Sequence, residues 1–191
     1  RARGAFIMLL AFLFFYYLAP RKWLDSKKIM NVFYYILTLG SLVFVVLYTA
    51  IGQLGIDFKL PFFYKNIFSG RQNIWLEVGK MFLRQPITGI GSGYTLNTFM
   101  EYNLHNAMYD LIAVHGILVF AGILFIVYKR FQGFRSIGCK KEMVVCALCA
   151  VFAVFLESFF DVDLIWADYA PNMLFLLTMI HSGKEQTIGE T

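Results

Sequence analysis

The chain has 191 residues and a formal net charge of +5, with 59% hydrophobic, 18% aromatic and only 15% charged residues. Soluble domains carry about 45–50% apolar and about 25% charged residues, so this composition excludes an ordinary soluble domain, a disordered chain and a collagen. The basic residues lie between apolar runs rather than on one helix face, which argues against nucleic acid as a partner. We therefore expect much of the surface to face a lipid bilayer.

Five apolar segments are typical of membrane-spanning helices and predict an all-α integral membrane protein. A hydrocarbon core of about 30 Å needs about 20 helical residues at a rise of about 1.5 Å each. The second and third segments reach this length, whereas the first and last are short and need interfacial aromatic residues such as Trp23 and Trp166. The predicted spans are residues 5–19, 29–51, 107–128, 143–160 and 169–180.

Two short connections between the spans are rich in basic residues. The positive-inside rule places both in the cytoplasm, so residues 52–106 become one long extracytoplasmic loop. The chain begins at Arg1 without a signal-peptide pattern, and we interpret residues 1–191 as the C-terminal half of a longer polytopic domain. The basic residues are Arg21, Lys22, Lys27 and Lys28, and Lys129, Arg130, Arg135, Lys140 and Lys141.

The long outer loop contains a pattern that predicts an amphipathic helix. Ser69 is followed three residues later by Gln72, a capping-box pattern that marks a helix start. The apolar residues that follow have helical spacing, and we expect this face to lie on the outer membrane surface. They are Ile74, Trp75, Val78, Met81 and Phe82. Residues 84–86 should end the helix, and the glycine-rich residues 88–93 should form a turn.

Three arginines on the outer side are candidate anion-binding residues. Arg71 falls in the first turn of the predicted helix, where unpaired N–H groups and the helix dipole favour a phosphate or diphosphate. Arg3 lies at the outer end of the first span, on the side where positive charge is expected to be scarce. Arg84 is a candidate supporting residue. The spacing alone equally allows all three to be surface or interfacial arginines.

His105 is the candidate general base because it precedes the third span on the same outer side as Arg71. An imidazole with a pKa near about 6.5 can accept a proton from a hydroxyl at neutral pH. Asn106 is a plausible N-cap of the span, and Asp110 is placed to orient the imidazole. An interfacial histidine without a catalytic role fits the same position.

Four acidic residues at the outer end of the last two spans allow a metal or general-base site, or simply two helix ends in the headgroup region. They are Glu157, Asp161, Asp163 and Asp168. Because they have no fixed ligand spacing, we predict no metal and no cofactor. The glycines at 89, 91 and 93 follow no predicted strand, so they do not indicate a nucleotide site.

Several strings, in this order and on one side of the membrane, resemble the C-terminal domain of the O-antigen ligase and polysaccharide polymerase family. The resemblance covers nearly the whole chain, including an Arg-Gly start at residues 3–4. The strings are Phe68-Ser69-Gly70-Arg71-Gln72-Asn73-Ile74-Trp75, Gln85-Pro86-Ile87-Thr88-Gly89-Ile90-Gly91, His105-Asn106 and Gly116.

The resemblance implies a GT-C-like membrane glycosyltransferase of about ten to twelve spans, without a metal or cofactor. Its donor would be a glycan on undecaprenyl diphosphate, held by residues matching Arg3 and Arg71, and its base would match His105. Transfer to a glycan or lipid-linked glycan acceptor would take place at the outer, periplasmic face of the bacterial cytoplasmic membrane. A chain-length regulator is a further partner to consider.

Four functions stay open at this point. A polymerase of lipid-linked surface polysaccharide is favoured, because such enzymes serve bacteria with one membrane as well as two. A ligase that moves the finished chain to lipid A core or a protein fits the same motifs. A non-enzymatic transporter of the lipid-linked glycan would need the arginines but no base. A structural membrane subunit would tolerate loss of both Arg71 and His105.

Overall fold

The computed structural model describes residues 3–55, 70–97, 104–135, 142–160 and 171–179, and these residues form helices and turns without a β-strand. Residues 171–179 are helical and belong to the fifth predicted span. The other elements, in chain order, are α1 (Arg3–Leu13), the π-helical turn η1 (Phe14–Leu18), α2 (Arg21–Asp25), α3 (Lys27–Gln53), α4 (Arg71–Phe82), α5 (Ala107–Arg135) and α6 (Glu142–Glu157).

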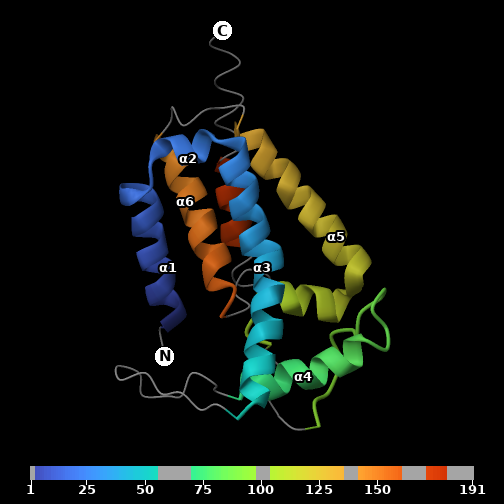
Figure 1. The fold of residues 1–191 in the computed structure, drawn as a ribbon. Coiled ribbons are helices and arrows are strands. Elements are labelled where there is room, and N and C mark those ends of the chain that lie inside the picture. The colour runs from blue at the N-terminus through green and yellow to red at the C-terminus, as the bar shows by residue number, and fades with distance from the viewer. Residues whose placement is uncertain (1–2, 56–69, 98–103, 136–141, 161–170, 180–191) are drawn as a thin grey trace.

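The longer helices stand side by side as a bundle, and short helices cross its two ends (Figure 1). Within the bundle, α6 contacts α1 and α3, and α3 contacts α5. The short helix α2 lies across one end, between Pro20 and the Ser26 side chain that caps α3. At the opposite end, α4 lies across the bundle and packs against α3 and α5.

The central helix is α6, whose side chains are buried around most of its circumference. A helix that is apolar on all sides is stable only where other elements or lipid cover it. Phe152 is fully buried, and its ring lies 5.4 Å from those of Phe15 and Phe33, which belong to η1 and α3. The segment predicted as the fourth span is therefore the helix around which the others pack.

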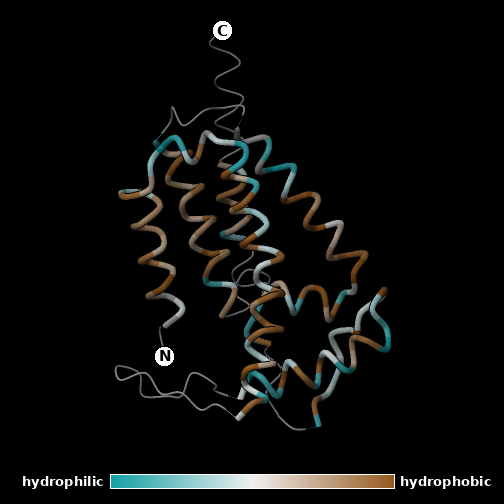
Figure 2. Tube along the Cα trace, in the orientation of Figure 1, coloured by the Kyte–Doolittle hydropathy of each residue, from teal (hydrophilic) through white to brown (hydrophobic). Residues whose placement is uncertain are grey.

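Among the described residues, two helices are by length and composition long and apolar enough to cross a membrane: Lys27–Gln53 and Ala107–Arg130. Hydrophobic residues run along the upright helices (Figure 2), and many of their side chains are exposed. On α3 the exposed residues include Val32, Ile36, Val43, Val46 and Leu47. Exposed apolar side chains over so much of one helix need a covering, and lipid supplies it in a membrane.

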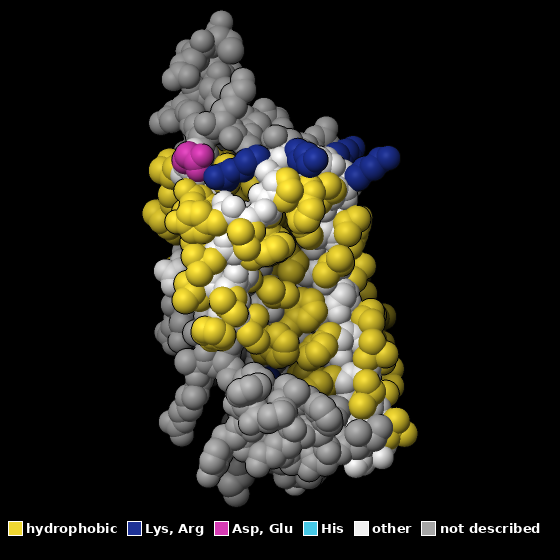
Figure 3. Space-filling view, turned by 60° about the vertical axis from the view of Figure 1, so that its left-hand side comes forward, with side chains coloured by type: hydrophobic (Ala, Val, Ile, Leu, Met, Phe, Trp, Pro, Cys, Tyr) yellow, Lys and Arg dark blue, Asp and Glu magenta, His cyan; other side chains and the backbone are white. Residues whose placement is uncertain are grey.

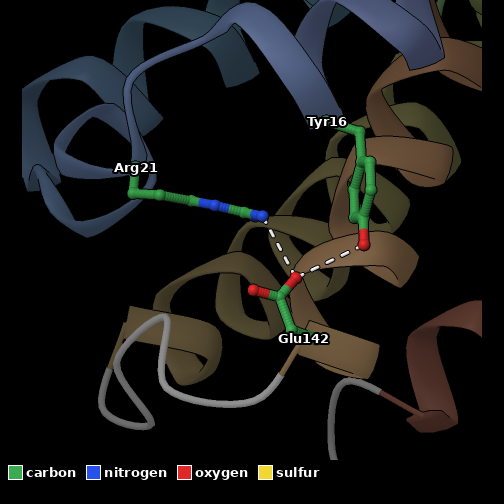
Figure 4. Close-up of polar contacts among 3 residues, drawn as sticks. All are labelled: Tyr16, Arg21 and Glu142. Atoms are coloured by element: carbon green, nitrogen blue, oxygen red, sulfur yellow. Dashed lines mark hydrogen bonds and ion pairs between the residues drawn. The ribbon is translucent and has the colours of Figure 1, made fainter.

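Lys and Arg side chains gather at the end of the bundle that carries α2 (Figure 3). Figure 4 shows one ion pair there, in which Arg21 Nη2 lies 3.1 Å from Glu142 Oε2. The hydroxyl of Tyr16 donates to the same oxygen at 3.3 Å, and the guanidinium lies over the Tyr16 ring. These contacts join the start of α6 to η1 and α2. Because the side chains are exposed, they contribute little to stability.

The predicted third span, residues 107–128, is not one continuous helix, because α5 is broken at Gly116 (φ 81°, ψ 170°). The loop after α4 fills the break with its own backbone. Ile90 N donates to Ala113 O (2.8 Å), Gly91 N to Val114 O (3.0 Å) and Ile117 N to Pro86 O (2.9 Å). The loop thus satisfies groups that an interrupted helix would leave without partners.

The break divides α5 into two parts of different direction. Residues 107–115 lie transversely near α4, and residues 117–135 rise along the bundle (Figure 1). At about 1.5 Å per residue, the rising part is about 28 Å long, close to the thickness of a hydrocarbon core. The transverse part presents its N-terminus, with His105 and Asn106 just before it, to the end of α6.

Candidate functional site

Three consecutive carbonyl groups that follow α6 organise the candidate site. Carbonyl groups that follow the end of a helix lie outside its hydrogen-bond pattern and need partners elsewhere when they are buried. Here the carbonyl of Ser158 accepts from Ala107 N (3.0 Å), that of Phe159 from Asn106 Nδ2 (3.1 Å) and that of Phe160 from Arg71 Nη1 (2.9 Å). The starts of α4 and α5 are thereby bound to the same short turn.

Arg71 lies in the first turn of α4, as predicted, and is the first residue of the helix, but the N-cap is not the predicted Ser69. The N-cap is Gly70, in the left-handed region at φ 88° and without a side-chain cap, while Ser69 lies outside the described residues. A glycine adopts this conformation without steric penalty. The partly buried guanidinium has five N–H donors, and its bond to Phe160 orients the group at the N-terminus of the helix.

Arg3 begins α1, and its neighbour Gly4 shows where this end of the helix lies. A Cβ atom on Gly4 would be 2.5 Å from Oε1 of Glu157, the last residue of α6. A larger residue at this position would require the Glu157 side chain to shift. The backbone of the Arg-Gly pair therefore meets the same end of α6 that binds Arg71 and Asn106.

His105 has an unusual backbone conformation. Its φ is +50°, and no other non-glycine residue in the described part of the chain has a positive φ. Such a conformation is uncommon for a side-chain-bearing residue, and it persists where the surroundings hold it. The imidazole is partly exposed, with its Nδ1 atom buried. Residues held in this way are concentrated at functional sites, which supports the choice of His105 as a site residue.

Asn106 caps α5, which confirms the prediction from sequence. Its Oδ1 accepts from Tyr109 N at 2.8 Å, and the completely buried side chain also exchanges hydrogen bonds with Ser41 of α3. Together with the bond from Nδ2 to Phe159, these contacts satisfy the amide from three directions. Asn106 thus joins α3, α5 and the end of α6 immediately beside His105.

Trp75 also belongs to the site, although the sequence did not predict its role there. The apolar side of α4 was expected to face the membrane, but Ile74, Trp75 and Val78 are buried against α3 and α5. The Trp75 indole Nε1 donates to the carbonyl of Leu104 at 2.5 Å, directly before His105. The sequence held one indication of this contact, because the indole N–H of a buried tryptophan needs a hydrogen-bond acceptor.

The two supporting candidates, Arg84 and Asp110, have different positions: Asp110 lies in the first turn of α5, and Arg84 lies beyond the end of α4. Arg84 is exposed beyond the last turn of α4, about 18 Å along the helix axis from Arg71. Asp110 was expected to orient His105, and its electrostatic neighbours in the structure include Tyr94 and His115. Burial, with the nearby Asp110 carboxylate, raises the pKa of Tyr94 to about 12, so its phenol stays neutral at physiological pH.

Of the predicted acidic cluster, Glu157 is described and is 5% exposed, whereas Asp161, Asp163 and Asp168 lie outside the described residues. Within the described ranges, no three His, Cys, Asp or Glu side chains are grouped so that they could hold a metal ion. The acidic residue that the structure brings to the site is therefore Glu157, beside Gly4.

No protein-family model, curated protein or solved structure significantly matches the chain. The resemblance to the O-antigen ligase and polymerase family therefore rests on the motif residues themselves.

Proposed function

We propose that the protein is a polymerase of lipid-linked surface polysaccharide, an inverting glycosyltransferase that works without a metal ion. The observation that carries the proposal is the meeting of Arg71, the His105–Asn106 pair and the start of α1 at the end of α6. Anion-binding and proton-accepting groups from separate parts of the chain thereby share one end of the bundle. A transfer from a diphosphate-linked donor needs such groups held close together.

In the proposed reaction, the guanidinium groups of Arg71 and Arg3 bind the diphosphate of an undecaprenyl-linked glycan. His105 accepts the proton of an acceptor hydroxyl, through Nε2 because its Nδ1 is buried. The hydroxyl oxygen bonds to the anomeric carbon while the bond from that carbon to the diphosphate breaks, and its electron pair leaves on the diphosphate. Attack opposite the leaving group inverts the anomeric configuration, and the arginines stabilise the charge that develops.

The proposal places the protein in the bacterial cytoplasmic membrane as a multi-pass protein with five spans in this chain and a GT-C-like relation. The Lys- and Arg-rich end of the bundle would face the cytoplasm under the positive-inside rule. The end of α6 at which Arg71 and His105 meet is the opposite end, so the reaction would take place at the outer face. There a polyprenyl diphosphate presents its charge at the depth of the lipid headgroups.

The strained backbone of His105 favours transfer over transport. A transporter of the same lipid-linked glycan would need the cationic groups but would have no use for a proton acceptor beside them. Holding a histidine at φ +50° requires surrounding contacts, and the structure supplies them at Leu104 and Asn106. A histidine that accepts a proton from a substrate hydroxyl must be held within hydrogen-bond reach of it, which gives a reason for this conformation.

The test is an assay of the full-length protein in liposomes with an undecaprenyl-diphosphate oligosaccharide, with the products separated by size. Wild type should produce a ladder of lengthened lipid-linked chains. His105→Asn should lower the rate by at least about 100-fold, because asparagine tolerates the left-handed conformation but is not a base. Arg71→Lys keeps the charge, loses the planar fork, and should raise the KM for the donor.

Arg84→Lys is the matched control, because it makes the same change at an arginine far from the end of α6 and should leave the ladder unchanged. Unchanged ladders from both His105→Asn and Arg71→Lys would refute the site. Transfer that takes place only when lipid A core is added would replace the polymerase by a ligase. A wild-type protein that transfers nothing but moves the lipid-linked glycan across the membrane would establish a transporter.

A further inference from the structure

Trp75 connects the helix that carries Arg71 to the backbone that carries His105. It follows Arg71 by four residues, which places the two side chains on the same side of α4. The indole is 2% exposed, and its Nε1 donates to the carbonyl of Leu104, a residue that is completely buried. The carbonyl of Leu104 belongs to the peptide group whose nitrogen is that of His105.

A second hydrogen bond returns from the other side of His105 to Trp75. The Tyr109 hydroxyl donates to the backbone carbonyl of Trp75 at 2.7 Å. Gly79, one turn further along α4, makes room for this hydroxyl, since a Cβ there would lie 3.1 Å from the phenol oxygen. The two bonds enclose residues 104–109, so the strained residue between them is fixed to α4 at both sides.

Aromatic rings hold the indole itself in place. The ring of Tyr48 lies 5.0 Å and that of Phe44 lies 6.1 Å from the Trp75 ring, between centroids, and both belong to α3. The indole therefore has little freedom to move away from Leu104. The backbone of His105, strained at φ +50°, persists only where its surroundings hold it, and the immobile indole N–H of Trp75 supplies such a contact.

From these contacts we infer that Trp75 is a positioning residue, which fixes the separation between the guanidinium of Arg71 and the imidazole of His105. The inference rests on the proposed function for its catalytic consequence, but the contact itself can be measured without activity. Trp75 touches no reacting atom in this scheme. It acts through the backbone of His105, with the hydroxyl of Tyr109 closing the connection.

The test compares Trp75→Phe and Tyr109→Phe with Tyr34→Phe as the matched control. Tyr34 also donates its hydroxyl to a backbone carbonyl, that of Leu124, at 2.7 Å, but this bond joins α3 to α5 and does not involve α4. The full-length protein is labelled with ¹³C at the Cε1 atoms of histidine, and the His105 NMR signal is identified by its loss in His105→Asn. Both test variants should shift the His105 signal and leave the His115 signal in place, whereas Tyr34→Phe should move neither.

Transfer kinetics on the same samples give the second measurement. Trp75→Phe should lower kcat by about 100-fold, the loss expected when a reacting group is misplaced by about 1 Å, and should leave the KM for the donor unchanged. Tyr109→Phe should have a smaller effect in the same direction, and it preserves the test if Trp75→Phe fails to fold. A His105 signal that is unmoved in the variants that fold would overturn the inference. A wild type without transfer would refute the proposed function instead, while the NMR signal still decides whether Trp75 holds His105.

Discussion

The break in α5 leads to a sharp prediction for Gly116→Ala. The residue lies at φ 81°, ψ 170°, a region that only glycine adopts readily, and the added Cβ would be 2.1 Å from the carbonyl oxygen of Ile87. The backbone conformation alone costs an alanine about 1–3 kcal/mol. The loop must also move by about 1 Å to relieve the contact, since ordinary van der Waals separations begin near 3.4 Å.

Movement of the loop endangers the three backbone hydrogen bonds that fill the break, each worth about 1 kcal/mol. We therefore expect Gly116→Ala to lower the free energy of unfolding by about 4–6 kcal/mol, an exceptional value for one methyl group. The assay is thermal or denaturant unfolding of the protein in detergent micelles, followed by circular dichroism.

Three other glycines separate the sources of this effect. Gly89→Ala combines a positive φ with a Cβ only 2.3 Å from Val114 O, so it should resemble Gly116→Ala. Gly91→Ala has a positive φ but open space around the Cβ, and should lose only the conformational part. Gly122→Ala has neither problem and lies within helical α5, where alanine is favoured by about 1 kcal/mol. If Gly116→Ala is as stable as Gly122→Ala, the reasoning about the break is wrong.

Three further predictions concern the site. Asn106→Ala should lower the free energy of unfolding by about 3–5 kcal/mol, because it removes a helix cap and leaves Ser41 and the Phe159 carbonyl without this partner. Asn106→Asp keeps the capping oxygen, so its loss of unfolding free energy in the same assay should be smaller. Tyr94 has a folded-state pKa of about 12, above its ordinary value of 10.0, so its contribution to stability is present below pH 10 and lost as the pH rises toward 12. Unfolding midpoints across that range should fall less steeply in Tyr94→Phe, and equal slopes would contradict the assignment. Removal of divalent cations with EDTA should leave the transfer rate unchanged, and a strict requirement restored by one cation would count against the two-arginine scheme.

Much of the local structure follows from the sequence. Continuous apolar runs predict the helices because a polar backbone in an apolar environment must satisfy its hydrogen bonds within the segment. Asn106 before an apolar run correctly predicts an N-cap, and the apolar spacing after Arg71 correctly predicts α4. These features depend on neighbours within a few residues, so the sequence contains the information that decides them.

Three features required the tertiary structure. The end of α6 meets Asn106, Arg71 and Gly4. Their partners Phe159, Phe160 and Glu157 lie 53, 89 and 153 residues further along the chain, and no local pattern predicts such a meeting. The amphipathic side of α4 packs against protein, although its spacing fits a membrane surface equally well, because periodicity identifies a buried face without identifying what buries it.

The break at Gly116 is the third feature. A glycine in an apolar run is compatible with a continuous helix, and the sequence of residues 107–128 therefore predicts one. The helix is interrupted because a distant loop supplies the N–H and C=O groups that the break would otherwise leave without partners, through Pro86, Ile90 and Gly91. The apolar pattern determines where helices form, but the direction of α5, and with it the position of His105, is decided by contacts between segments that only the fold brings together.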